Sequence, residues 1–232
     1  YAGADFALGH QAIVDDLAGR FPELSEAALA LDLGCGPLDV TFRLLEKFPG
    51  LTVHGVDGSR PMLQLAQDEL RRRGFEDRVN LFEQCLPDLT LPASVYPLIF
   101  SSSLLHHLHE PNDLWQVVRT FGGPGTRVFI ADLYRPESCE AAEAIVDKSA
   151  PDEPDVLKQD FLNSLLAAFT PEEVRAQLAH AVWVVGGELL DGRGHAAVRV
   201  ALAQHQVDGA AQHRISSGSP PGPPTPRCVE SC

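Results

Sequence analysis

Residues 29 to 37 read Leu29-Ala-Leu-Asp-Leu-Gly-Cys-Gly-Pro37, and this stretch decides the fold. It starts as an apolar strand and ends in a glycine-rich turn, which a helical pattern follows. A second apolar strand, Leu51-Thr-Val-His-Gly-Val-Asp57, then ends in an acid. Strand, glycine turn, helix, strand and terminal acid form the β-α-β layout of a nucleoside-binding half. Glycine permits the sharp turn because it tolerates positive φ, and an acid at the strand end can accept both hydroxyl hydrogens of a ribose.

The glycine turn argues against a phosphate-bearing nucleotide. In the dinucleotide pattern G-x-G-x-x-G, the third glycine corresponds to Asp39 here, and a carboxylate would repel phosphate. Pro37 lacks the backbone N–H that a pyrophosphate needs at a helix start. The Gly-Lys-Ser/Thr sequence of a phosphate-binding loop is also missing. These features disfavour an NAD-dependent reductase and indicate a nucleoside without phosphates, such as S-adenosylmethionine.

The sequence resembles the class I S-adenosylmethionine-dependent methyltransferases of the small-molecule type over roughly residues 1–180. Five segments carry the resemblance in the family's order: 31–37, 56–63, 81–92, 96–108 and 125–133. The chain departs from the family in three places. Leu38 replaces the usual third glycine of the first motif, Gln84-Cys85 replaces the acid often found in the adenine loop, and the C-terminal end matches poorly.

The resemblance implies a set of cofactor-binding residues: Asp32, Gly34, Cys35, Gly36, Asp57, Gly58, Met62, Gln84, Cys85 and Ser101. Within this set, Asp57 would hold the ribose, whereas Met62, Gln84 and Cys85 would lie near adenine. Asp32 would shape the loop at the methionine end of the cofactor. Each residue also has a plain structural interpretation, such as a loop cap for Asp32 and helix core for Met62.

The histidines His106, His107 and His109 form the most tempting cluster in the sequence. A metal site needs three or four ligands in suitable geometry. We expect no metal site because the neighbours His106 and His107 should point in different directions and no acid or cysteine partner is evident. We select His107 as a candidate general base that faces the substrate cavity.

Two further segments are candidates for substrate and cofactor contacts by the same resemblance. The amphipathic stretch 157–170 follows the fifth strand, where this family often closes over its substrate, and it supplies Asp160 and Asn163. An N-terminal lid over the cofactor would use Tyr1, Asp5 and Phe6.

The pattern predicts a Rossmann-like, doubly wound, mostly parallel sheet with helices on both faces, a three-layer αβα sandwich. The expected strands are 28–33, 52–56, 79–83, 96–101 and 127–132, alternating with helices. Strand-end polar residues should line one crevice: Asp32, Asp57, Glu83, Ser101 and Asp132. Residues 183–185 and 196–203 are expected to form final antiparallel strands. An uncovered sheet edge there would favour a homodimer.

Composition limits the class of protein. The chain has 232 residues and a formal net charge of −14, which disfavours nucleic acid and anionic membrane partners. Its five cysteines are scattered, so we expect reduced thiols and a cytoplasmic location. The sequence contains no apolar run of about 18 residues, the length that a membrane span needs. We expect one methyltransferase domain at 1–203 and a disordered tail at 204–232, which is rich in proline and serine.

Two functions remain open from the sequence. The first is an S-adenosylmethionine-dependent methyltransferase that acts on a small-molecule acceptor. The alternative is a catalytically degenerate relative that binds the cofactor as a regulatory or partner protein, which Leu38 and the unusual C-terminal end favour.

Overall fold

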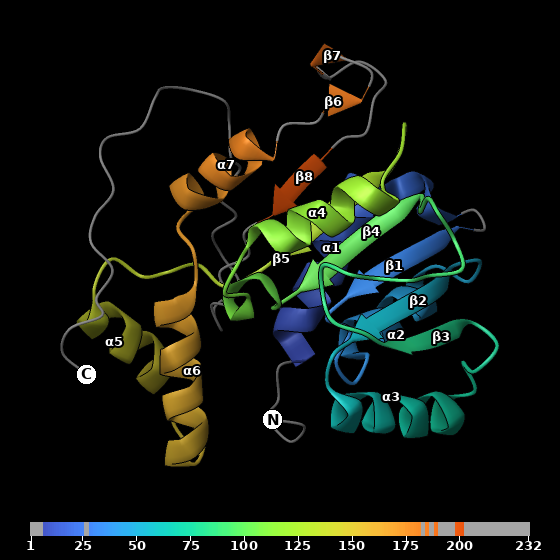
Figure 1. The fold of residues 1–232 in the computed structure, drawn as a ribbon. Helices are drawn as coiled ribbons and strands as arrows, with labels where there is room; N and C mark the ends of the chain where they lie inside the picture. The colour runs from blue at the N-terminus through green and yellow to red at the C-terminus, as the bar shows by residue number, and fades with distance from the viewer. Residues whose placement is uncertain (1–6, 26–27, 182–183, 186–187, 190–197, 202–232) are drawn as a thin grey trace.

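A computed structural model of the protein describes residues 7–25, 28–181, 184–185, 188–189 and 198–201 (Figure 1). Its main sheet has six strands in the order β3-β2-β1-β4-β5-β8, and all neighbouring pairs run parallel. The strands are β1 (Leu29–Leu33), β2 (Thr52–Asp57), β3 (Val79–Glu83), β4 (Leu98–Ser102), β5 (Arg127–Ala131) and β8 (Val198–Ala201). The predicted Rossmann-like parallel sheet is therefore confirmed.

Helices cover both faces of the sheet, as the sequence predicts. They are α1 (Ala7–Arg20), α2 (Asp39–Lys47), α3 (Arg60–Arg73), α4 (Asn112–Phe121), α5 (Cys139–Ser149), α6 (Asp155–Ala167) and α7 (Pro171–His180), with 3-10 turns η1 (Pro22–Ser25) and η2 (Leu105–His107). Side chains of α1, α2 and α3 share one buried cluster with the sheet. Side chains of α4 and α7 share a second cluster with the opposite face.

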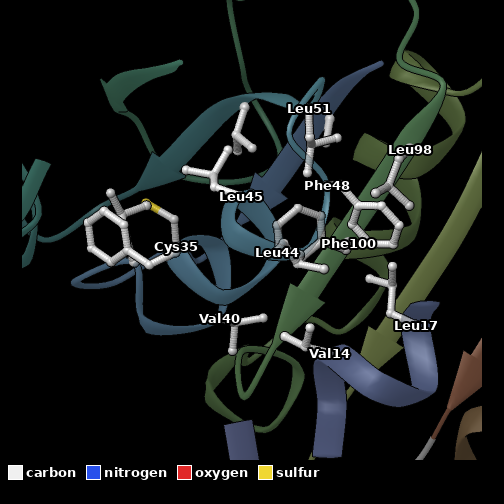
Figure 2. Packing of buried hydrophobic residues seen from close by; sticks show 14 of the residues in the cluster. Val14, Leu17, Cys35, Val40, Leu44, Leu45, Phe48, Leu51, Leu98 and Phe100 are labelled. Atoms are coloured by element: carbon white, nitrogen blue, oxygen red, sulfur yellow. The ribbon is translucent and has the colours of Figure 1, made fainter. Parts of the chain in front are cut away.

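The first cluster shows how the sequence pattern becomes packing. Leu44 and Leu45 of α2 are buried together with Val14 and Leu17 of α1. Figure 2 shows these side chains gathered against Phe100 of β4. Apolar residues at helical spacing form one continuous stripe, so burying this stripe fixes α1 and α2 on the sheet.

Helices α5 and α6 form a separate small core instead of covering the sheet (Figure 1). Its buried residues are Leu133, Ala142, Val146, Leu165 and Ala168. Helix α6 also packs against the turn η2. The end of the fourth strand thus meets a helical unit that has its own core.

The prediction of final antiparallel strands is wrong for the sheet. Strand β8 pairs parallel with β5, with Val128 opposite Val198. A parallel neighbour requires a long crossover connection, and α5, α6 and α7 lie between β5 and β8 in the chain. Residues Val184–Val185 (β6) do pair antiparallel, but with Glu188–Leu189 (β7) in a separate small sheet.

Strand β8 covers the β5 edge, so the described residues offer no support for a homodimer through that edge. The predicted tail at 204–232 and the predicted lid residues Tyr1, Asp5 and Phe6 lie outside the described residues. None of the helices in the described part of the chain has the length and apolarity that crossing a membrane requires.

Candidate functional site

The loop after β1 is held against the end of β2 by backbone hydrogen bonds. The N–H groups of Gly34 and Cys35 both donate to the carbonyl of Val56, at 2.8 and 3.0 Å. Gly34 and Gly36 have φ values of 70° and 50°, in the left-handed region that glycine adopts without a steric penalty. The predicted glycine turn is therefore present, and it lies at the carboxyl ends of the two central strands.

Asp57 links this loop to the start of α3. Its Oδ2 accepts the N–H of Gly36 at 2.9 Å, and its Oδ1 accepts the N–H of Ser59 at 2.7 Å. A carboxylate has about four acceptor positions, so both oxygens keep capacity for further donors. The acid is thus oriented by two backbone groups and remains able to accept hydroxyl hydrogens.

The two glycines differ in what surrounds them. A Cβ at Gly34 would lie 2.8 Å from Cδ1 of Leu104, whereas a Cβ at Gly36 would meet no atom of the described residues within 4 Å. Gly34 is therefore required by packing against the segment that leads into η2. Gly36 faces open space, which is what close approach of a ligand to the backbone requires.

Leu38 occupies the position where the resembled family has a third glycine. It has φ 72° at the N-cap of α2, a left-handed conformation that costs a leucine about 1–2 kcal/mol. Its side chain is fully buried in the cluster beneath α1 and α2. Burial of the leucine side chain offsets this strain, because a buried leucine contributes a few kcal/mol.

Asp32 is buried beneath the loop and accepts a hydrogen bond from the hydroxyl of Thr41 on α2. The pKa of Asp32 is raised to about 7. Burial is the main cause and the charge of Asp57 adds to it, while the Thr41 hydrogen bond acts in the opposite direction. This carboxyl ties β1 to α2 through a side-chain hydroxyl, not by capping backbone N–H groups of the loop. A nearby cation would favour its ionised form.

The adenine loop shows where the predicted residues 84 and 85 lie. The Gln84 amide donates to the carbonyl of Thr90 at 2.9 Å and accepts the Thr90 N–H at 2.7 Å. A Cβ at Gly58 would lie 2.8 Å from Sγ of Cys85, and the N–H of Gln84 donates to the carbonyl of Asp57 at 3.2 Å. The loop therefore borders the ribose acid, but the Gln84 side chain is used to shape the loop.

The remaining predicted cofactor residues divide by exposure. Met62 is half-buried in the first turn of α3. Ser101 is buried, and its hydroxyl donates to the carbonyl of Leu33 at 2.8 Å, so this hydroxyl joins β4 to β1. Cys35 is buried (Figure 2), and a Cβ at Gly55 of β2 would lie 3.0 Å from its Sγ. Glu83 instead faces solvent and pairs with Arg60 at 3.0 Å.

Burial raises the pKa of the Cys35 thiol, and the charges of Asp32 and Asp57 raise it further. A thiol in that state is a poor nucleophile. The backbone groups of Cys35 are engaged within the loop, the N–H with the carbonyl of Val56 and the carbonyl with the N–H of Leu38.

A buried carboxylate organises the histidine turn η2. Asp132, just after β5, accepts the N–H of Leu105 at 2.6 Å and that of Leu133 at 2.7 Å. It also accepts a hydrogen bond from Nδ1 of His106, and the exposed fractions of the two side chains are 3% and 2%. The expectation that the histidines lack an acid partner is therefore wrong, because Asp132, which follows β5, is that partner.

The two neighbouring histidines lie close together rather than apart. Their ring centroids are 4.0 Å apart with an interplanar angle of 39°, so the expectation of diverging side chains is wrong. Partial desolvation lowers the pKa of His107, and proximity to His106 lowers it further, against the opposing charge of Asp132. His109 is exposed. Among the described residues, no group of three or more His, Cys, Asp or Glu side chains is placed to hold a metal.

A cavity of about 330 Å³ opens beside the histidine turn. It is lined by His106, His107, Asp160, Asn163, Ser164 and Ala167. The structure therefore brings together His107, Asp160 and Asn163, which the sequence singles out separately. Leu104, which precedes η2 and contacts the backbone position of Gly34, connects this cavity to the glycine loop.

A second cavity, of about 440 Å³, lies between the start of α4 and α7. Its lining includes Trp115, Glu173 and Gln177. These groups already have partners, because Trp115 Nε1 donates to Gln177 at 3.1 Å and Glu173 pairs with Arg135 at 2.7 Å. Glu173 also forms a capping box with Thr170 at the start of α7. We therefore place the candidate acceptor site in the cavity beside η2.

Three residues of the site are not predicted from the sequence: Thr41, Leu104 and Ser164. The sequence also does not predict that Asp132 orients His106. The position of Asp132 at a strand end is visible in the sequence, but its partner is not. Contacts between a strand end and a turn that are separated by more than twenty residues require the fold.

Comparison with known proteins agrees with this geometry. Residues 31–128 match the family model described as a methyltransferase domain. Over these residues the chain is similar to methyltransferase domains. A trans-aconitate 2-methyltransferase from Azoarcus sp. (strain BH72) is 37% identical over 97 residues, which are 41% of this chain and 34% of that protein. The chain spans about a third of the length of the first curated relatives that it matches.

Solved methyltransferases share the fold. The plantazolicin methyltransferase BpumL, in complex with a triazolic desmethylPZN analog and SAH, superposes with a TM-score of 0.59 at 15% identity, covering 77% of this chain and 64% of that chain. A SAM dependent methyltransferase from Aquifex aeolicus gives 0.54 at 19% identity, covering 72% and 78%. At these identities the likeness shows the fold alone.

Proposed function

We propose that this chain binds S-adenosylmethionine at the carboxyl ends of β1 and β2 and transfers its methyl group to a small-molecule acceptor. The observation that carries the proposal is the 2.9 Å hydrogen bond from the Gly36 N–H to Asp57. It joins the glycine loop to the ribose acid, while the space above Gly36 stays open. Loop, acid and open space together match what a nucleoside without phosphates requires.

The residues present fit this cofactor. The free acceptor capacity of Asp57 suits ribose hydroxyls, and the loop around Gln84 and Cys85, together with Met62, borders the adenine side. The carboxyl groups of Asp32 and Asp57 would favour a cation, such as a sulfonium, placed between these residues and the acceptor cavity. When bound, S-adenosylmethionine supplies an electrophilic methyl group on a sulfonium centre. The chain's own task is to orient the acceptor and exclude water.

The proton of a hydroxyl acceptor needs a base, and we place that base at His106. The Asp132 carboxylate accepts Nδ1–H of His106, which fixes the tautomer and leaves Nε2 as the proton acceptor, by the logic of a Ser-His-Asp triad. The sequence candidate His107 lines the same cavity. The lowered pKa of His107 favours its neutral form. Among the contacts described for His107, none is a hydrogen bond to a carboxylate that would orient its ring.

A small acceptor and a cytoplasmic location also belong to this proposal. The cavity of about 330 Å³ suits a small molecule, and the net charge of −14 disfavours nucleic acid and anionic membrane surfaces. Cys35 and Cys85 are free thiols, as expected in a reducing compartment. Because the Azoarcus relative is named for trans-aconitate, that compound belongs in an acceptor screen.

The second candidate, a cofactor-binding protein without turnover, draws on one observation. Leu38 fills the position of the family's third glycine with a strained, buried side chain. A screen separates the two functions: the chain is incubated with S-adenosylmethionine and varied acceptors, and S-adenosylhomocysteine is measured by mass spectrometry. Release of S-adenosylhomocysteine above an acceptor-free control supports the transferase. Saturable cofactor binding without release across the screen supports the regulatory alternative.

A further inference from the structure

We infer that the cavity beside η2 selects an uncharged or cationic acceptor and rejects acceptors that carry a carboxylate. The inference rests on the proposed methyl transfer and adds the acceptor's chemical class. It stands on the side chains that line the cavity and on the charges directly behind them.

The lining contains one group with a full charge at neutral pH, the carboxylate of Asp160 on α6. No lysine or arginine lines the cavity in the described part of the chain. Asn163 contributes a neutral amide whose oxygen already accepts a hydrogen bond from Gln159 at 3.1 Å, so its N–H groups remain as donors. Ser164 adds a buried hydroxyl.

The histidines do not replace the missing cation. His107 is exposed, and partial desolvation and its proximity to His106 lower its pKa, which disfavours the cationic form. His106 donates Nδ1–H to Asp132, and this second carboxylate lies directly behind the cavity wall. An acceptor in the cavity therefore meets the Asp160 carboxylate directly, while the Asp132 carboxylate is separated from it by the His106 side chain.

Nearby cations are already engaged elsewhere. Lys158, on the same helix as Asp160, donates from Nζ to the carbonyl of Pro151 at 2.7 Å. Arg135 pairs with Glu173 at 2.7 Å and donates to the carbonyl of Ala168 at 3.2 Å. An anionic acceptor would lose its hydration without gaining a counter-ion, and burying an unpaired charge is costly.

Three compounds with one catechol ring test the inference: catechol is neutral, dopamine is cationic and 3,4-dihydroxybenzoate is anionic. Each is titrated by calorimetry into the protein already saturated with S-adenosylhomocysteine. We expect catechol and dopamine to bind at least about tenfold more tightly than 3,4-dihydroxybenzoate, because like charges brought together oppose binding. Failure of S-adenosylhomocysteine itself to bind would instead refute the proposed function at the first step.

Variants of α6 provide the second half of the test. Asp160→Asn is expected to reduce the preference for dopamine, and Asp160→Lys to reverse the order of dopamine and 3,4-dihydroxybenzoate. Asp155→Lys makes the same charge change at an exposed position of α6 outside the cavity lining, so it should preserve the order. Three results overturn the inference: wild type binds the anion as tightly as catechol, Asp160→Lys leaves the order unchanged, or none of the three binds while S-adenosylhomocysteine does.

Discussion

The cofactor crevice and the acceptor cavity lie at the same end of the sheet, yet they are built differently. The crevice consists largely of backbone groups in the loop after β1, fixed by Val56 and by Asp57. The cavity consists of side chains from η2 and α6, and α6 belongs to a helical unit with its own small core. Substitutions in α6 can therefore alter acceptor choice while the crevice, which is part of the central sheet, remains intact.

The largest expected effect separates the two regions by changing the proposed base alone. His106→Gln should lower the rate of methyl transfer by roughly 10²–10⁴-fold, the usual contribution of a general base, and leave the affinity for S-adenosylhomocysteine unchanged. Steady-state kinetics and calorimetry on the same preparation measure both quantities. His107→Gln is the matched control, with an expected loss below about tenfold. If His107→Gln is the more damaging change, the base belongs at His107, the candidate selected from the sequence.

A second effect concerns the stability of the crevice as a function of pH. The pKa of Asp32 is about 7 in the folded protein, compared with 3.8 for an unperturbed aspartate. Between these values the folded state retains a proton that the unfolded state has lost. The contribution of Asp32 to stability is therefore fully present below about pH 4 and falls as pH rises to 7, by up to roughly 4 kcal/mol.

Asp32→Asn tests this directly, because asparagine is neutral and can still accept the Thr41 hydrogen bond. Urea unfolding at pH 5 and pH 8 should show the variant gaining stability relative to wild type as pH rises. Asp68→Asn, at an exposed site on α3, should follow the wild-type dependence. Parallel stability curves for wild type and Asp32→Asn would show that Asp32 has an ordinary pKa in the folded protein.

The smallest expected effect concerns Leu38, where the chain departs from the family within the crevice. Leu38→Gly would remove about 1–2 kcal/mol of left-handed strain but delete a fully buried side chain, a loss of about 2–5 kcal/mol. The variant should therefore be less stable than wild type by up to roughly 4 kcal/mol in urea unfolding. A more stable Leu38→Gly variant would mean that strain, rather than packing, dominates at this position.

The sequence predicts the crevice well because its signals are local. Apolar strands, Gly34, Gly36 and Asp57 fall within a single β-α-β unit, and parallel strands bring their carboxyl ends together. Helix α3 ends before Gly74, which has φ 73°, whereas Ser59 at its start makes no side-chain capping hydrogen bond. Each of these features depends on a few neighbouring residues.

The sequence predicts the cavity only in fragments because its signals are tertiary. His107 and Asp160 are recognisable as candidates, but the pairing of His106 with Asp132 depends on where η2 meets the end of β5. The predicted direction of strand β8 is wrong for a related reason, since alternating residues predict a strand but not its direction in the sheet. Gln84 differs again, because the sequence does not show that its side chain is bound within its own loop.

Calorimetric titration of S-adenosylhomocysteine into wild type, Asp57→Ala and Asp68→Ala tests the central claim most directly. We predict saturable one-to-one binding to wild type and to Asp68→Ala, and its loss in Asp57→Ala, with circular-dichroism melting showing that all three proteins are folded. Asp68 is an exposed aspartate on α3 and controls for the loss of one charge. Undiminished binding to a folded Asp57→Ala protein, or no binding to folded wild type, would contradict the assignment of the crevice as the cofactor site.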